Sequence, residues 1–180
     1  MSALSRSRLR SKTHPDYESF TRLYETSFPI FEQRTSDQQE LALKDSRYEL
    51  VLFKQDDLFV GFVAAWIFEE CVYIEHLAVN TQIRGRGFGS RMMQDFICSQ
   101  DKVVILEIDP VVDEKSRARL RFYQKCGFKL NAYTHWHPPY RKGFNAHSLM
   151  ILSSDREISL EEYEAFNAHL CSEVMAFEAQ

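Results

Sequence analysis

The residues with the clearest chemical potential form a glycine-rich segment in the middle of the chain. Residues 84–89 read Arg-Gly-Arg-Gly-Phe-Gly, and Ser90 follows them. An apolar run precedes this segment, and an amphipathic helical pattern from Phe88 to Ile97 follows it. The first turn of a helix has unpaired N–H groups and a positive partial charge, and glycine lets an anion approach the backbone. We therefore expect residues 84–90 to bind phosphate, with Arg84 and Arg86 adding positive charge.

Two well-known phosphate-binding motifs fit this segment poorly. Gly85, Gly87 and Ser90 approximate the dinucleotide pattern, and Glu107 lies 20 residues after Gly87. The third glycine, however, stands at position 89, and only one β-α-β step follows. No Gly-Lys-Ser/Thr occurs, which argues against a Walker loop. A plain turn with solvated arginines is a further alternative, although three alternating glycines between a strand and a helix disfavour it.

The elements before the glycines indicate helices and then an antiparallel meander. A helix is predicted from a capping Thr13 to Pro29, and a second helix at Ser36–Lys44. Strands are predicted at Tyr48–Phe53, Leu58–Phe68 and Val72–Val79, separated by short acidic turns.

The elements after the glycines complete a mixed domain. Lys102–Ile108 has the apolar pattern of a strand buried on both faces, and Asp113 begins a helix that ends near Gly127. Phe128–Trp136 and Ala146–Leu152 are predicted to form a hairpin. This order predicts an α+β fold, in which a mostly antiparallel sheet contains one parallel strand pair around the glycine segment.

The two ends of the chain are assigned to the same single domain, residues 1–180. We expect residues 1–8 to be flexible, Leu9–Lys12 to form a short first strand, and residues 156–178 to form a C-terminal helix capped by Ser159. The apolar stripe of this last helix is most simply explained by core packing, with a homodimer contact as the alternative.

Composition excludes several classes of function. The 180 residues carry a net charge of −4, and without a basic surplus we expect no nucleic-acid partner. The longest mostly apolar run, Leu58–Phe68, is too short to span a bilayer, so no membrane association is expected. No apolar segment follows the basic N-terminus, which argues against a signal peptide. The four cysteines lack CxxC spacing, which suggests reduced thiols in the cytoplasm.

Two motifs together resemble the GCN5-related N-acetyltransferase (GNAT) family. The family signature Gln/Arg-x-x-Gly-x-Gly/Ala matches residues 82–87, Gln-Ile-Arg-Gly-Arg-Gly. A second pattern, Phe-Tyr-x-x-x-Gly-Phe, matches residues 122–128, about 40 residues further along the chain. The resemblance extends over about residues 9–152.

The resemblance implies that acetyl-CoA binds between two splayed parallel strands, here Val72–Val79 and Lys102–Asp109. The first strand would pair with the pantetheine arm, and one of its N–H groups would stabilise the oxyanion of the thioester. Ser116 stands where many members have Asn, and it would make a shorter-reaching hydrogen bond to the pantetheine or phosphate. The implied acetyl-CoA-binding residues are Leu77, Ala78, Val79, Arg84, Gly85, Arg86, Gly87, Phe88, Gly89, Ser90 and Ser116.

The same resemblance implies catalytic roles. Tyr123 matches the family's general acid, which protonates the leaving thiolate, although its apolar stripe is also compatible with a core tyrosine. An amine with a pKa of about 10.4 must lose a proton before attack, so a base is useful. Glu75 is the leading candidate, because a carboxylate inside an apolar strand is unusual unless it faces water or a cleft. An ion pair is its alternative explanation. His76 is the second candidate base, on the opposite face unless a strand bulge intervenes.

The resemblance also implies that the region between the first two helices lines an acceptor pocket, and further polar residues are predicted near it. Glu32 lies between the first two helices and could attract a cationic amine, although an exposed loop acid is the favoured interpretation. His135 and His137 share one strand face, and with the segment Trp136–Tyr140 they would form a pocket wall. A zinc site would need further ligands, so no metal is expected.

These expectations combine into one predicted function. The chain is expected to be a cytoplasmic N-acetyltransferase that moves an acetyl group from acetyl-CoA to a small-molecule amine by direct attack in a ternary complex. A non-catalytic acyl-CoA-binding module and an acetyltransferase acting on protein N-termini or lysines remain the alternatives.

Overall fold

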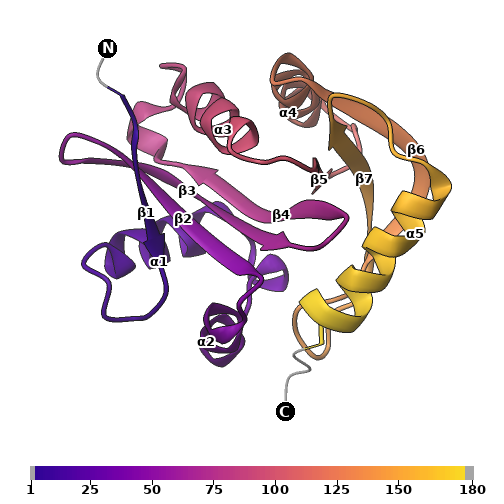
Figure 1. Ribbon diagram of the computed structural model, residues 1–180, viewed down its shortest axis with the longest axis horizontal. Helices are drawn as coiled ribbons and strands as arrows, with labels where there is room; N and C mark the ends of the chain where they lie inside the picture. Colours follow the sequence, from indigo (N-terminus) through magenta and orange to yellow (C-terminus); the bar gives the residue numbers. More distant parts are fainter. Residues whose placement is uncertain (1–2, 177–180) are drawn as a thin grey trace.

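The computed structural model describes residues 3–176, which contain a seven-stranded mixed sheet (Figure 1). The strand order is β1-β2-β3-β4-β5-β7-β6, and every neighbouring pair except β4 and β5 is antiparallel. This architecture confirms the predicted α+β class. The strands are β1 (Ser5–Leu9), β2 (Tyr48–Gln55), β3 (Leu58–Ile67), β4 (Cys71–Val79), β5 (Val103–Ile108), β6 (Phe128–His137) and β7 (His147–Ser154).

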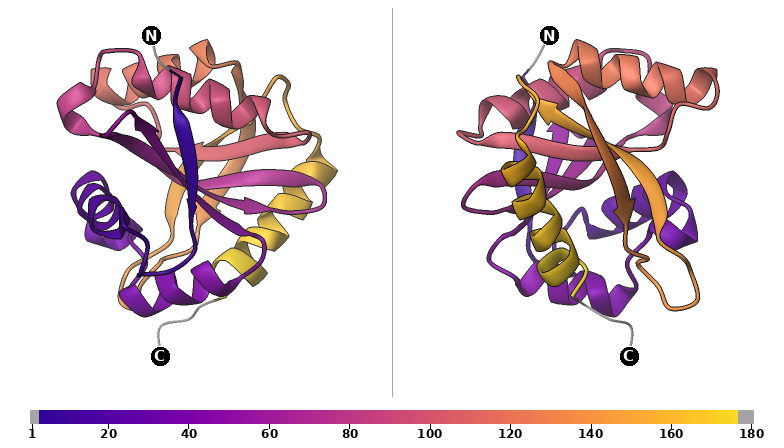
Figure 2. Two further views of the ribbon diagram at one scale, coloured as in Figure 1. Left: turned by 60° about the vertical axis from the view of Figure 1, so that its left-hand side comes forward. Right: turned by 90° about the vertical axis from the view of Figure 1, so that its right-hand side faces the viewer.

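Helices cover both faces of the sheet and create two apolar cores (Figure 2). One core lies under α1, α2 and α5, and the other under α3 and α4. Within residues 3–176, every helix is too short or too polar to traverse a lipid bilayer. The helices are α1 (Tyr17–Ser27), α2 (Ser36–Lys44), α3 (Phe88–Cys98), α4 (Glu114–Lys125) and α5 (Leu160–His169), with short turns η1 (Ile30–Glu32), η2 (Thr81–Ile83) and the π-helical η3 (Leu170–Val174).

The first strand lies closer to the N-terminus than the predicted strand at Leu9–Lys12. The first strand lies at Ser5–Leu9 and pairs with β2 from Lys54 to Leu50, so residues 5–8 belong to the sheet instead of a flexible tail. Alternating serine and arginine hid this edge strand, because its outward side chains are polar. Arg8 forms an ion pair with Glu49 on the neighbouring strand. Residues 1 and 2 lie outside the described part of the chain.

One helix start differs from the predicted one, and another lies at the predicted cap. The first helix begins at Tyr17, because residues 13–16 form a turn in which the His14 N–H donates to the Ser11 carbonyl. The last helix begins at Leu160, directly after its predicted cap Ser159. Phe166 in this helix and Leu170 and Val174 in the following η3 are fully buried, which confirms the core-packing interpretation. Residues 177 and 178 of the predicted helix lie outside the described residues.

The parallel pair β4 and β5 diverges at the centre of the sheet. Their ladder runs from Cys71↔Val103 to Ile74↔Leu106 and then stops, although β4 continues for five more residues to Val79. The two strands therefore splay apart beside the glycine-rich turn, as the sequence analysis expects. This opening is the feature that positions the candidate site.

Candidate active site

A cavity of about 1020 Å³ occupies the opening between β4 and β5. The glycine-rich turn bounds one end, and the segment between α1 and α2 together with the β6–β7 hairpin bounds the other. The wall residues used below come from separate elements and are Glu32, Glu75, Leu77, Ala78, Val79, Arg84, Gly85, Gly87, Gly89, Ser90, Glu107, Asp109, Lys115, Arg119, Tyr123, His137, Tyr140 and His147.

The glycine-rich turn has the backbone that the phosphate-binding prediction requires. Gly85 and Gly87 adopt φ values of +80° and +79°, a region that side chains with a Cβ rarely occupy. A Cβ built on either residue would meet no atom within 4 Å, so the space above the turn is open. Gly87 is also the N-cap of α3, which leaves the first N–H groups of that helix without intrahelical partners. The turn can therefore hold an anion on its main chain.

Positive side chains also line the cavity. Arg84 stands in the turn itself, Lys115 and Arg119 come from α4, and the Arg84 Nε donates to the carbonyl of Val79 at 3.1 Å. Arg86 and Phe88 do not line the cavity wall. The combination of free amides and cations suits a diphosphate.

The strand residues predicted beside the pantetheine lie on the cavity. Leu77, Ala78 and Val79 all line it, beyond the point where the ladder to β5 ends. Backbone groups on this side of β4 are therefore accessible to an extended ligand that pairs with the strand edge.

Tyr123 lines the same cavity from α4. Its ring packs edge-on against Phe122 and Phe128, with centroid distances of 5.1 and 5.8 Å. Burial raises the pKa of the phenol to about 12, and Arg119 partly opposes this shift. The hydroxyl is consequently protonated at neutral pH and can donate a proton or a hydrogen bond into the cavity.

The predicted base Glu75 has a different environment from the one expected. Its side chain is 0% exposed, and its Oε1 lies 2.8 Å from the Nε of Arg34, whose side chain is 1% exposed. The indole N–H of Trp66 donates to its Oε2 at 2.8 Å. Burial disfavours the charged form, but Arg34 outweighs this effect and holds the pKa of Glu75 below its usual range. The geometry therefore corrects the prediction: Glu75 is a buried ion-pair partner and is poorly suited to take a proton.

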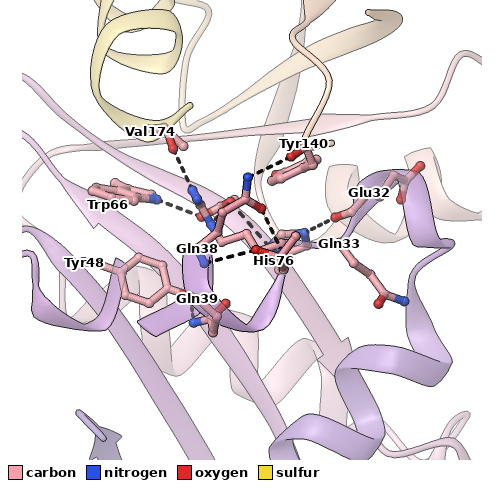
Figure 3. A network of polar contacts seen from close by, with 12 residues as sticks. Glu32, Gln33, Gln38, Gln39, Tyr48, Trp66, His76, Tyr140 and Val174 are labelled. Atoms are coloured by element: carbon pink, nitrogen blue, oxygen red, sulfur yellow. Dashed lines mark hydrogen bonds and ion pairs between the residues drawn. The ribbon is translucent and has the colours of Figure 1, made fainter. Parts of the chain in front are cut away.

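Glu75 and His76 reach the same face of β4 because the strand contains a bulge. The register passes from Ala64↔His76 to Ala65↔Ile74, so Glu75 is the extra residue. The His76 ring packs against Phe28 at a centroid distance of 4.7 Å, and its Nε2 donates to the Glu32 carbonyl at 2.8 Å (Figure 3). Burial lowers the pKa of His76, so the ring is neutral and acts as a structural tether.

Ser116 does not reach the cavity. It stands at the third position of α4, where its hydroxyl accepts hydrogen bonds from the N–H groups of Val112 and Asp113. Its own N–H donates to the Asp113 carboxylate at 2.7 Å, which completes a capping box. The prediction that Ser116 contacts the ligand is not supported by this geometry, because its hydrogen-bonding groups serve the helix start.

The prediction that the β6–β7 hairpin forms a wall of the pocket was partly right. His137 and Tyr140 line the cavity, and His135 is buried on the same strand face. Trp136 points away and is 57% exposed, so it is no part of the wall. Within the described residues, no group of three or more His, Cys, Asp or Glu side chains is arranged to hold a metal ion.

A buried polar cluster around Glu107 on β5 was not predicted from the sequence. The Tyr73 hydroxyl and the His135 Nε2 both contact its carboxylate, and the His137 Nε2 lies 3.8 Å away. Burial disfavours the charged form, but these histidines hold the pKa of Glu107 below its usual range. A carboxylate inside the run Val-Val-Ile-Leu-Glu-Ile was a signal for this cluster, of the kind that identified Glu75.

Glu32 is also more buried than expected. The residue ends η1, is half-buried and lines the cavity, so the interpretation as an exposed loop acid was wrong. Burial, assisted by the nearby charge of Asp109, raises the pKa of Glu32 to about 7.

Comparisons with known proteins agree with this architecture. The profile of the acetyltransferase (GNAT) family matches residues 17–128. A search of curated proteins found no match. A solved structure of a GNAT-family acetyltransferase from Bacteroides thetaiotaomicron is 25% identical, with a TM-score of 0.89 over 95% of this chain and 98% of that chain.

Two further structures share the fold at lower identity. A Bacillus subtilis acetyltransferase in complex with CoA is 19% identical, with a TM-score of 0.59 over 85% of this chain and 99% of that one. An Elizabethkingia anophelis GNAT acetyltransferase with acetyl-CoA bound is 16% identical, with a TM-score of 0.59 over 87% and 100%.

Proposed function

The chain belongs to the acetyltransferase (GNAT) family, and from this premise we propose that it transfers the acetyl group of acetyl-CoA to the amine of a small molecule. The observation that carries the proposal is the splay of β4 and β5 beside a turn with two left-handed glycines. The splay opens a cavity of about 1020 Å³ whose lining residues differ in chemistry from one part to another. One end suits a diphosphate, and the other has acidic, imidazole and aromatic side chains.

The main chain at residues 84–90 is the proposed holder of the CoA diphosphate. The open space above Gly85 and Gly87 supports this role, as do the unpaired N–H groups at the start of α3. Arg84 and Lys115 would contribute charge. In the same proposal, the backbone of residues 77–79 orients the pantetheine, and a β4 N–H stabilises the oxyanion that forms on the thioester carbonyl.

Tyr123 is the proposed general acid. The amine nitrogen attacks the acetyl carbonyl carbon, a C–N bond forms, and the C–S bond breaks with its electron pair on sulfur. A protonated phenol beside that sulfur neutralises the thiolate as it leaves. The pKa of about 12 supports this role, because it keeps the proton on Tyr123 across the working range of pH.

A small-molecule acceptor is favoured because the acceptor end of the cavity is closed by contacts between its two bounding segments. The Arg141 guanidinium donates to the carbonyls of Gln33 at 2.9 Å and Arg34 at 3.2 Å. The Gln38 amide donates to the Tyr140 carbonyl at 3.0 Å. These bonds join the α1–α2 segment and the first turn of α2 to the β6–β7 hairpin, and an extended peptide would have to break them in order to lie between these parts.

The cytoplasm is the proposed location. Cys71, Cys98, Cys126 and Cys171 are all free thiols, which suits a reducing compartment.

Thiol release from acetyl-CoA tests the proposal. Purified protein is incubated with acetyl-CoA and a panel of primary amines, and in parallel with peptides that bear a free N-terminus or a lysine. We expect CoA thiol and an acetylated product with members of the amine panel. Calorimetric CoA binding without thiol release from any acceptor would support a non-catalytic binding module, and turnover of peptides alone would move the acceptor to proteins.

A further inference from the structure

The acidic side chains of the cavity differ in whether they have partners. Among the carboxylates that line it, Glu75 is paired with Arg34, Glu107 with His135, and Asp109 with Arg119. Across residues 3–176, the carboxylate of Glu32 makes no hydrogen bond or ion pair. A half-buried carboxylate without a partner has lost hydration and gained no compensating contact, which is an arrangement that a bound cation would relieve.

The backbone that carries Glu32 is held firmly. Pro29 follows the end of α1, and the three residues of η1 come next. His76 on β4 donates to the Glu32 carbonyl, while the Glu32 carboxylate points away from the buried network (Figure 3). The ring of Phe31 lies 6.0 Å from that of His147, across the cavity mouth. The tether to β4 thus fixes an unpaired carboxylate at a definite place in the cavity wall.

These observations assign a role that rests on the proposed function. We propose that Glu32 binds the acceptor as an ammonium ion and takes its proton before attack. The ammonium has three N–H bonds and the amide product has one, so two protons leave the nitrogen. Glu32 accepts the first and releases it to solvent. The second restores Tyr123 after that residue has protonated the CoA thiolate.

The charges around Glu32 agree with this task. Burial, with a smaller contribution from Asp109, raises its pKa to about 7, and Arg119 opposes the increase. A base with a pKa near the working pH combines a populated charged form with a sufficient affinity for a proton. The charged and titratable side chains that line the same cavity include Asp109 directly after β5, Arg119 on α4, His76 on β4, His137 on β6 and His147 on β7.

The pH dependence of kcat/KM for the amine tests the assignment. The acceptor should be a primary alkylamine from the panel, with a pKa near that of lysine, about 10.4. With wild-type protein, we expect kcat/KM to rise through pH 7, as Glu32 loses its proton, and then to stay level until the amine itself deprotonates. The Glu32→Gln variant must bind the scarce neutral amine, so its kcat/KM should keep rising tenfold per pH unit beyond pH 7.

The size of the effect and the controls sharpen the test. At pH 8, Glu32→Gln should lower kcat/KM about 100-fold, the lower end of general base contributions. Glu32→Asp should retain the wild-type profile at a reduced level. Glu25→Gln removes the same charge from an exposed position on α1 and should change nothing. Folding of each variant is checked by its thermal transition.

The outcomes separate this assignment from the proposed function. A Glu32→Gln variant that keeps both the rate and the levelling-off of the wild type would overturn the role of Glu32 alone. A wild-type protein that acetylates no amine would overturn the proposed function, and the role of Glu32 with it. Loss of the plateau in Glu32→Gln, with CoA affinity unchanged, would support the assignment.

Discussion

The two ends of the cavity are built in different ways. At the glycine turn the wall is mainly backbone: two left-handed glycines and the start of α3 present N–H groups to open space. At the other end the wall consists of side chains from the α1–α2 segment, β4 and the β6–β7 hairpin. Buried contacts such as the Arg34–Glu75 pair hold these side chains in place. A backbone wall depends on a few neighbouring residues, whereas a side-chain wall depends on residues that meet only after folding. Mutations should therefore affect the two ends differently.

The largest expected effect is on the side-chain end. Replacing Arg34 by alanine leaves the Glu75 carboxylate buried without its cation, which costs about 3–5 kcal/mol when a buried pair is broken. We expect a loss of this size in the free energy of unfolding, measured by urea denaturation. Glu75→Gln in the same chain should restore part of it.

An exposed pair provides the control for this prediction. Arg22 contacts Glu18 on the surface of α1, with both side chains more than 70% exposed. Arg22→Ala should leave the stability nearly unchanged, as is usual for surface pairs. Equal losses for the Arg34 and Arg22 variants would contradict the view that the buried network supports the acceptor end.

A smaller effect is expected from the phenol between the two ends. Tyr123→Phe keeps the ring packing against Phe122 and Phe128 and removes only the proton donor. We expect kcat to fall about 100-fold, as for loss of a general acid, with the CoA dissociation constant unchanged. Tyr17→Phe, on α1 and away from the cavity, is the matched control. Normal turnover in Tyr123→Phe would remove this residue from the mechanism.

The smallest effect belongs to the backbone end. Gly87→Val places a branched side chain at a φ of +79° and fills the open space above the turn. A turn that escapes this strain, about 1–2 kcal/mol, leaves the conformation proposed to bind CoA, so CoA affinity should fall about tenfold or more. Isothermal titration with CoA measures this change.

The control for Gly87 separates strain from occlusion. Gly143 in the β6–β7 loop has a φ of +90° and equally open surroundings, so Gly143→Val introduces the same kind of strain away from the turn. CoA affinity should be normal in that variant. A similar loss in both would mean that Gly87 acts through stability and not through contact with CoA.

The contrast between the ends also explains what the sequence could predict. The glycine turn, α3 and the Tyr123 motif are local patterns, because period, capping and glycine conformation act over a few residues. The partners of Glu75 and Glu107 are not local: Arg34 and His135 lie 41 and 28 residues away from them along the chain. No spacing rule pairs them, so Glu75 was predicted as a base and the partial burial of Glu32 was not predicted.

The bulge in β4, which the sequence raised only as a possibility, decides which side chains of this strand face the cavity. It was needed to see that Glu75 and His76 face the same side, but a bulge has no reliable local signature. The edge strand at Ser5–Leu9 was missed for a similar reason, since its polar residues gain their strand conformation from pairing with β2.

The extra residue in β4 has a consequence for the shape of the protein. The ladder to β5 ends at Ile74↔Leu106, directly before Glu75, and a bulge bends the strand that contains it. The width of the cleft therefore depends on the number of residues in β4. A strand shortened by one residue at this point would keep Ile74 and His76 opposite their present neighbours on β3. It would also run straight alongside β5, and the room for a thioester would disappear without any change in the chemistry of the remaining walls.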